Sequence, residues 1–176
     1  SGALLGRWWS SLARALRHFR TRNSRSGSRR NIAYHYDLGN AFYRRWLDET
    51  MTYSAALFTK EGQSLAEAQR AKYRRIADLA EVKQGARVLE IGCGWGGFAR
   101  LAAKEYGAHV EGITLSAEQL AFAREASEAT GLTEQTAFHY RDYRDQKGRY
   151  DAIVSIEMFE AVGEEHWSSY FKALKR

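Results

Sequence analysis

The stretch "RVLEIGCGWGGFARLAA", Arg87 to Ala103, decides the fold of this 176-residue chain. It opens with an apolar run, Val88 to Ile91, that is typical of a buried strand, and it ends in a helical pattern. Four glycines lie between the two patterns. Because glycine has no Cβ and tolerates positive φ, a ligand can lie against the bare backbone of such a turn. The N-terminus of the following helix offers unpaired N–H groups, so the stretch predicts a nucleotide-type site.

Strands and helices alternate on the C-terminal side of this stretch. Beyond the strand at 87–91, the pattern predicts strands at 109–115, 136–140 and 151–156, with helical segments between them. Strands that are joined through helices form parallel sheets with right-handed crossovers. The predicted fold class is therefore α/β, a Rossmann-like parallel sheet flanked by helices.

Helix starts are marked by two capping boxes, "SLAE" from Ser64 and "SAEQ" from Ser116. The helix after the first box is expected to bury four apolar residues: Leu65, Ala68, Ile76 and Leu79. Further upstream the chain is dense in aromatic residues. There Asn40 is expected to cap a short helix that carries Phe42, Trp46 and Leu47.

Positive charge is concentrated at the N-terminus. The chain has a net charge of +6, and residues 1–30 contain eight arginines and no acid, which leaves the remainder at −2. Residues 3–20 place Trp and Leu on one helical face and Arg on the other, a pattern typical of an interfacial helix and also of a helix packed on a core. Residues 20–30 resemble a basic Ser/Gly linker. Such an arm fits an anionic partner, either a lipid surface or a nucleic acid.

The chain is accordingly divided into three segments. Residues 1–30 are expected to form the basic amphipathic helix and linker, 31–80 a helical cap with the aromatic segment, and 81–176 the nucleotide-binding domain. Hydrophobic content of 44% indicates a globular chain. The single cysteine, Cys93, excludes an internal disulfide and suits a reducing cytosol.

The glycines satisfy two patterns at once. Gly92, Gly94 and Gly97 match G-x-G-x-x-G, the dinucleotide fingerprint. Gly92, Gly94 and Gly96 match the G-x-G-x-G of S-adenosylmethionine (SAM) methyltransferases. Neither match is specific by itself, so the surrounding residues must decide between the two nucleotides.

Two neighbouring features favour SAM over NAD. A dinucleotide site needs an acid at the end of the second strand to hold the ribose, but Glu111 lies in mid-strand and the end reads Thr114-Leu115-Ser116. Glu90 precedes the glycines by two residues, as in the E-x-G-x-G of methyltransferases. SAM has no pyrophosphate, yet its amino-acid end needs backbone polar groups, so close approach to glycine serves it too.

With these residues in place, the chain resembles the cyclopropane-fatty-acyl-phospholipid synthases and their mycolic-acid relatives. Six motifs occur in the order of that family: "YHYDLGNAFY", "TYSAALF", "VLEIGCGWGG", "GITLSAEQ", "RDYRD" and "SIEMFEAVG". The likeness covers residues 31–176. It implies a SAM-dependent enzyme that transfers a methyl or methylene group to the double bond of an unsaturated fatty acyl chain of a phospholipid.

In that reaction the alkene attacks the sulfonium methyl and becomes a carbocation. In cyclopropane formation a base, held to be a bound bicarbonate, then removes a proton so that the ring closes. Because an alkene is a poor nucleophile, the site must exclude water and hold the reactants in line. The aromatic density of residues 34–58 fits such a dry, cation-stabilising pocket.

The resemblance also implies roles for individual residues. Cofactor contacts are implied at the amino-acid end for Tyr53, Ser54, Gly92 and Gly94, at the ribose for Thr114, Leu115 and Gln119, and at the adenine for Asp142 and Tyr143. The side chain of Glu160 and the backbone of Ile156 would hold the bicarbonate. A carboxylate among apolar neighbours, as at Glu160, needs a partner. No metal ligand is implied.

Several of these residues have a purely structural interpretation as well. Tyr53 fits an ordinary core position, Gln119 would close the capping box, and Asp142 would cap a turn. Cys93, between two glycines, fits a small buried filler better than a nucleophile activated by a helix N-terminus. His35 fits a structural hydrogen bond as well as a catalytic role.

Two departures from the family pattern bear on the reaction. The cyclopropane synthases carry after "TYS" a Cys that helps to hold bicarbonate, but this chain has Ala55. Bicarbonate is therefore a doubtful cofactor, and a relative that methylates without closing the ring fits as well. The family's fold also continues with further strands and a substrate half that includes a bicarbonate-holding His and Tyr. This chain is thus expected to be an N-terminal fragment that lacks the C-terminal strands.

The expected partners are phospholipid acyl chains and an anionic membrane surface, at the cytoplasmic, inner face of a membrane. A non-catalytic lipid-surface module with a residual SAM pocket is an alternative, as is a small-molecule or RNA methyltransferase. No base-stacking motif is visible, so no nucleic acid is expected. Monomer and homo-oligomer both stay open.

Overall fold

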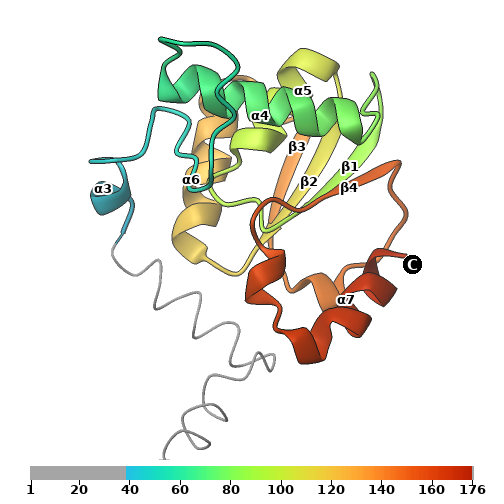
Figure 1. Ribbon diagram of the computed structural model, residues 1–176. Coiled ribbons are helices and arrows are strands. Elements are labelled where there is room, and N and C mark those ends of the chain that lie inside the picture. Colours follow the sequence, from blue (N-terminus) through green and yellow to red (C-terminus); the bar gives the residue numbers. More distant parts are fainter. Residues whose placement is uncertain (1–38, 176) are drawn as a thin grey trace, which may run out of the picture.

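A computed structural model describes residues 39–175. The expected helix at 3–20, the linker at 20–30 and His35 lie outside the described residues. The α-helices and strands, in chain order, are α3 (Gly39–Tyr43), α4 (Leu65–Leu79), β1 (Arg87–Ile91), α5 (Gly97–Tyr106), β2 (His109–Thr114), α6 (Ala117–Ala129), β3 (Thr136–Tyr140), β4 (Ala152–Val154) and α7 (Trp167–Leu174). Three 3₁₀ turns, η1 (Tyr143–Asp145), η2 (Phe159–Ala161) and η3 (Glu164–His166), complete the order (Figure 1).

The four strands form one parallel sheet in the order β3-β2-β1-β4. In its register Val88 lies beside Val110 on one side and Ala152 on the other. The predicted α/β class with a parallel sheet is confirmed. The predicted strands at 109–115 and 151–156 are too long, most of all at β4, which spans only three residues. β4 is an edge strand with β1 as its one neighbour, and its pairing runs only from Ala152 beside Val88 to Val154 beside Glu90.

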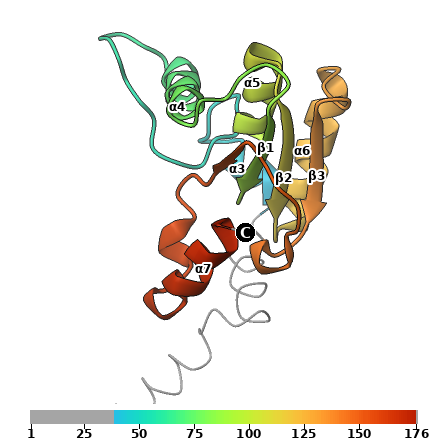
Figure 2. The same ribbon diagram turned by 90° about the vertical axis from the view of Figure 1, so that its right-hand side faces the viewer.

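Each face of the sheet has its own apolar core. On one face Val88, Val110 and Phe138 pack with Phe98 of α5 and Ala123 of α6, and α4 lies on the outside of α5. On the other face Leu89, Ile91 and Ile113 meet residues from the segments after β3 and β4 and from α7. In both views α7, in red, lies near the carboxyl ends of the strands, away from α4 and α5 in green (Figures 1 and 2).

The predicted caps are confirmed only in part. Ser64 forms a complete capping box with Glu67 at the start of α4. Ser116 accepts a hydrogen bond from the Gln119 amide at 3.3 Å, but the Gln119 side chain turns to Thr114 and does not close the box. The side-chain oxygen of Gln119 finds a buried hydroxyl donor there, which a capping position would not provide.

Two predictions about helices near the N-terminus are wrong. Leu65 and Leu79, expected in the core, are 42% and 67% exposed, because they are the first and last residues of α4. Asn40 lies inside α3 and does not cap it. Its carboxamide oxygen instead accepts a hydrogen bond from the Trp95 indole at 2.6 Å, and Trp46 lies in the turn after the helix.

Among residues 39–175, no helix combines the length and apolar character that a membrane span requires. The same part of the chain has no group of three or more His, Cys, Asp or Glu residues that could hold a metal ion.

The topology of the sheet indicates where a ligand would bind, namely at the edge where the strands end. In parallel α/β sheets, ligands bind at that edge, beside the strand where the winding direction reverses. Here the reversal lies between β1 and β4.

Candidate functional site

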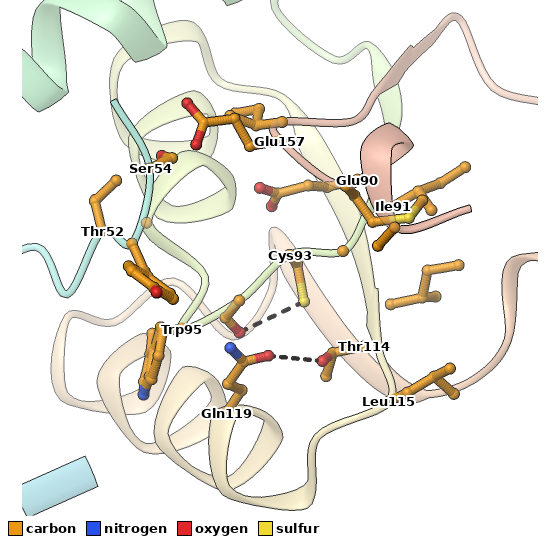
Figure 3. A pocket seen from close by; sticks show the side chains of 18 of the residues that line it. Thr52, Ser54, Glu90, Ile91, Cys93, Trp95, Thr114, Leu115, Gln119 and Glu157 are labelled. Atoms are coloured by element: carbon orange, nitrogen blue, oxygen red, sulfur yellow. Dashed lines mark hydrogen bonds between the residues drawn. The ribbon is translucent and has the colours of Figure 1, made fainter. Parts of the chain in front are cut away.

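A cleft of about 980 Å³, its open mouth included, lies at the carboxyl ends of the strands. Its walls come from 51–54, before α4, and from three segments at or just after strand ends: 90–95, 113–115 and 156–158. Arg141 and Tyr143, after β3, also line it. Every strand of the sheet thus delivers residues to one site, at the position where parallel α/β sheets bind ligands (Figure 3).

The glycine turn forms the floor of this cleft. Gly92, Gly94 and Gly96 all have positive φ, which only glycine adopts without cost. A Cβ on Gly92 would approach Met158 to 2.9 Å, whereas a Cβ on Gly94 would meet nothing within 4 Å. Gly94 therefore leaves open space on the cleft side of the turn.

Glu90, the last but one residue of β1, is buried in the wall of the cleft and points into it (Figure 3). Burial raises the pKa of Glu90 to about 8, although the Ala99 amide and the cations Arg100 and Lys72 counteract the rise. Its Oε2 has no hydrogen-bond partner among the described residues. The side chain therefore holds a proton at neutral pH and presents a polar edge to a ligand.

The end of β2 forms the opposite wall. Thr114 donates its hydroxyl to the Gln119 side-chain oxygen at 3.0 Å, and both side chains are buried. Thr114 also accepts a hydrogen bond from the Ser116 amide at 3.1 Å. These bonds hold the Gln119 carboxamide at the cleft, beside Thr114 (Figure 3).

The segment 51–55 forms a third wall and is fastened to α4. Gln69 donates its side-chain amide to the Ser54 carbonyl at 2.8 Å. Lys72 donates to the Ala55 carbonyl at 2.8 Å and to the Ser54 hydroxyl. Burial lowers the pKa of Lys72 to about 8, so the amine is largely charged at neutral pH. This wall is therefore held by α4 rather than by secondary structure of its own.

Aromatic side chains line the mouth of the cleft beside this wall. The Tyr43 ring lies 5.0 Å from that of Trp95 and 5.6 Å from that of Tyr53, between ring centroids. Trp46 meets Tyr53 edge to face at 5.3 Å. Tyr53 is 51% exposed, so the interpretation of this residue as ordinary core is wrong. Tyr43 and Trp95 are buried and support this cluster, whereas Tyr53, which lines the cleft, and Trp46 leave apolar area exposed.

The cleft brings together most of the residues that the sequence singled out. Those that line it are Tyr53, Ser54, Gly92, Gly94, Thr114, Leu115, Gln119, Tyr143 and Ile156. Asp142 does not line it: the carboxylate is buried, accepts from the Arg144 amide at 2.9 Å and pairs with the Arg144 guanidinium. It caps η1, as the structural interpretation expected.

Glu160 also lies outside the cleft. It is exposed on η2. Within the part of the chain that the structure describes, the expected apolar environment for this carboxylate is therefore wrong. Its apolar neighbours in sequence, Met158 and Phe159, turn to other sides of the 3₁₀ turn: Met158 enters the core below the sheet, and Phe159 stacks on Trp167 with 5.1 Å between the ring centroids. Adjacent residues of a tight turn point in different directions, which a linear pattern does not reveal.

The residue at the cleft that sequence reasoning missed is Glu157. Its Oε1 accepts a hydrogen bond from the Ala55 amide at 2.8 Å, and the residue lines the cleft. Its φ is +47°, a conformation that costs a residue with a Cβ about 1–2 kcal/mol. Strain of this kind is kept where the surrounding structure requires it, often at functional sites. The only signal in the sequence was an acid directly after Ile156.

The surroundings of Cys93 and Glu111 support the interpretation of Cys93 as a buried filler and the preference for SAM over NAD. Cys93 is buried, and burial raises the pKa of its thiol, so it is a filler of the core and no nucleophile. Glu111 lies inside β2, where Arg141 donates to it at 2.9 Å and Tyr150 at 2.6 Å. It is therefore occupied within the sheet and is not placed to hold a ribose at the strand end.

Glu90 should make the stability of the protein pH-dependent. Its pKa is about 8 in the fold and 4.5 for an ordinary glutamate, so the folded state binds the extra proton and loses stability as pH rises from about 4.5 to about 8. The linked free energy is on the order of 3–5 kcal/mol. Glu90→Gln should therefore raise the free energy of unfolding at pH 8 far more than at pH 5, measured by urea denaturation. Glu125→Gln, at an exposed site on α6, should show no such difference, and an equal gain at both pH values for Glu90→Gln would contradict the assignment.

Comparison with known proteins shows the family. A family model described as mycolic acid cyclopropane synthetase matches residues 23–176. The tuberculostearic acid methyltransferase UfaA1 of Mycobacterium tuberculosis is 48% identical over 161 residues, which is 88% of this chain and 38% of that protein. The cyclopropane-fatty-acyl-phospholipid synthase of Escherichia coli K12 is 44% identical over 142 residues, 81% of this chain and 36% of that protein.

Solved structures agree with this result. The mycolic acid cyclopropane synthase CmaA1, crystallised with SAH and CTAB, superimposes with a TM-score of 0.81 at 32% identity, covering 84% of this chain and 52% of that chain. The cyclopropane synthase MmaA2 of Mycobacterium tuberculosis gives a TM-score of 0.80 at 33% identity, with 83% and 51% covered. The chain spans less than two fifths of the length of the two curated relatives named above. On the family match and these identities, the chain belongs to the mycolic acid cyclopropane synthetase family of SAM-dependent methyltransferases.

Proposed function

We propose that the cleft binds SAM and that the protein transfers its methyl group to the double bond of an unsaturated acyl chain of a phospholipid. The observation that carries this proposal is the cleft itself: the ends of all strands and the open backbone at Gly94 converge on one site. A structure of the related CmaA1 contains SAH, the product that SAM leaves after methyl transfer. Apolar side chains and a few polar groups line the cleft together, as in small-molecule sites.

The geometry supports a position for each part of the cofactor. Tyr53, Ser54 and the backbone at Gly92 and Gly94 surround the place proposed for the amino-acid end. The ribose would meet Thr114, Leu115 and Gln119, and the adenine would lie beside Tyr143. Asp142 would act indirectly, because its bonds to Arg144 fix the turn from which Tyr143 projects.

The aromatic mouth supports a hydrophobic acceptor. Tyr53, which lines the cleft, and Trp46 beside it are the exposed rings, and they pack on the buried rings of Tyr43 and Trp95. The exposed rings offer apolar area to an acyl chain and electron-rich faces to a cation. A carbocation formed at the double bond needs both dryness and such faces, since water would capture it. We therefore place the acyl chain along this surface, with its double bond toward Ser54.

Ala55 favours a product without a ring. The resemblance assigned bicarbonate to a cysteine at this position, and the alanine methyl cannot donate a hydrogen bond to an anion. The lost bond to a buried anion is worth roughly 1.5–3 kcal/mol. UfaA1, described as a methyltransferase, is 48% identical to this chain, and the cyclopropane synthase of Escherichia coli is 44% identical. We propose a methyl or methylene branch as the main product and the cyclopropane as the alternative.

We also propose that residues 1–30 bring the protein to an anionic membrane surface at the inner face of the cytoplasmic membrane. Eight arginines without an acid give this segment a charge of +8, and the remainder of the chain is acidic. A phospholipid substrate lies in a membrane, so an attachment of this kind would bring the enzyme to it.

Gly94→Ala should weaken SAM binding at least tenfold, because the added methyl enters the open space of the cleft and nothing in the protein compensates for it. Gly131→Ala is a matched control: its φ is +68°, its Cβ would also meet nothing within 4 Å, and it lies at the far end of α6. Both variants should lose about 1–2 kcal/mol of stability because alanine is strained at positive φ, and only Gly94→Ala should lose affinity by titration calorimetry. Equal SAM affinity in the two variants would argue against this position for the cofactor.

The product should be a methylene-branched chain. We expect this result when the full-length protein is incubated with SAM and a phospholipid that carries a monounsaturated acyl chain. A methylene branch and a cyclopropane add the same CH₂ and have the same mass, so the lipid should be treated with ozone, which cleaves the alkene and spares the ring. An ozone-resistant product of this same mass is the cyclopropane and would show that Ala55 does not decide the outcome as argued.

Removal of residues 1–30 should reduce binding to vesicles that contain anionic lipid. Each arginine near such a surface contributes about 1 kcal/mol, and salt screens the attraction. The loss in co-sedimentation should therefore be largest at low salt and absent with neutral vesicles. If the shortened protein sediments with anionic vesicles as well as the original does, another surface makes the contact.

A further inference from the structure

We propose that Glu157 is the catalytic base of this protein, the group that accepts the proton released by the methylated acyl chain. This inference rests on the function proposed above. It starts from the Glu157 carboxylate, which crosses the mouth of the cleft to the amide of Ala55 (Figure 3). In this proposal the proton acceptor is a side chain of the protein itself. It lies beside Ala55, the residue at the position where the cyclopropane synthases have the anion-holding cysteine.

The contact at Ala55 holds the carboxylate in place. The Ala55 amide donates to Oε1 at 2.8 Å, which is a good hydrogen-bond length. A carboxylate has a second oxygen with its own lone pairs, so one oxygen can be held while the other receives a proton. The backbone of Glu157 adopts φ of +47° to make this reach. A glycine would adopt that conformation without cost. The backbone strain at this position therefore arises because the residue carries a side chain.

Lys72 completes the arrangement from the side of α4. Its amine donates to the carbonyl of Ala55, the same residue whose amide holds Glu157. Lys72 also attracts Glu157 electrostatically, as it does Asp48 and Glu90. Both polar groups of the Ala55 backbone are thus bonded, and its amide anchors one oxygen of the Glu157 carboxylate. Preorganisation of this kind is what a base needs in order to act on a short-lived cation.

The other carboxylates near the cleft do not fit this role. Of the residues described as lining it, Glu90 and Glu157 alone carry a carboxyl group. Glu90 is fully buried and holds its own proton at neutral pH, so it has no vacancy for another. Glu160 lies outside the cleft on η2. Glu157 is exposed at the mouth, which also lets it return the proton to water.

The step balances without any further reagent. The alkene π electrons form the bond from one alkene carbon to the methyl carbon, while the methyl–sulfur bond breaks and its electron pair stays on sulfur, giving SAH. The other alkene carbon becomes a cation, and a hydride shift from the methyl-bearing carbon moves the charge to that carbon. Glu157 then takes a proton from the new methyl group, and the C–H electron pair forms the C=CH₂ double bond of the methylene branch. The neutral carboxyl group finally releases its proton to solvent.

Two variants of the full-length protein test this role. Glu157→Gln keeps the shape and the hydrogen bond from Ala55 but cannot take up a proton. General base catalysis contributes about 10²–10⁴-fold, so kcat should fall at least about a hundredfold while the SAM Kd stays within about threefold. Glu157→Gly suits the local φ and removes the carboxylate, so added formate should restore turnover at least about tenfold above its own baseline.

Glu164→Gln, at an exposed site seven residues along the chain, is the matched control and should keep its turnover. Retention of more than about a tenth of wild-type kcat by Glu157→Gln, or no response of Glu157→Gly to formate, would overturn the assignment. A loss of SAM affinity in Glu157→Gln as large as its loss of kcat would overturn it as well, because it would indicate a binding role. A wild-type protein that methylates no unsaturated lipid would instead refute the proposed function, independently of Glu157.

Discussion

The room available for a side chain at each glycine of the turn between β1 and α5 is the constraint on which the rest of this structure depends. A Cβ on Gly96 would come within 2.9 Å of Phe138, and one on Gly97 within 2.7 Å of the Tyr73 hydroxyl. These two glycines let α5 lie against both the sheet and α4, which brings α4 close enough to carry the segment 51–55 to the cleft. Gly94 has the opposite surroundings, with open space where a side chain would be. One short turn therefore serves packing on its inner side and a ligand on its outer side.

The wall at 51–55 shows how a segment without secondary structure becomes part of a site. Its polar backbone groups need partners, and Gln69, Lys72 and Glu157 provide them from two distant parts of the chain. The Thr52 hydroxyl adds a hydrogen bond of 2.8 Å to Tyr73, which packs in the core under the glycine turn. Wall and floor are thus coupled through α4, so a change in α4 is expected to reach the cofactor as well as the acyl chain.

Two acids at the same cleft are given different properties by their surroundings. Glu90 lies in the sheet, where burial raises its pKa to about 8 and leaves a neutral group. Glu157 lies at the mouth, held by a backbone amide and near the charged Lys72. The two carboxyl groups at this cleft therefore differ in burial and in the groups that contact them.

The sequence by itself determined the architecture, because hydrophobic periodicity and the glycine turn act over a few neighbouring residues. The parallel sheet, the start of α4 at Ser64, and the presence of Gly94, Thr114 and Gln119 at one edge all follow from such local patterns. Family resemblance added residues such as Ser54 that lie far from that turn in the chain.

Only the tertiary structure decided which acid faces the cleft. Glu157 and Glu160 are three residues apart, yet Glu157 lines the cleft, whereas Glu160, on the 3₁₀ turn η2, does not. The same holds for Asp142, whose carboxylate serves Arg144, and for Asn40, which Trp95 takes as a partner across 55 residues. Side-chain direction in a turn depends on individual φ values and on contacts from distant segments. No periodic pattern in the chain encodes either, so these assignments required the folded molecule.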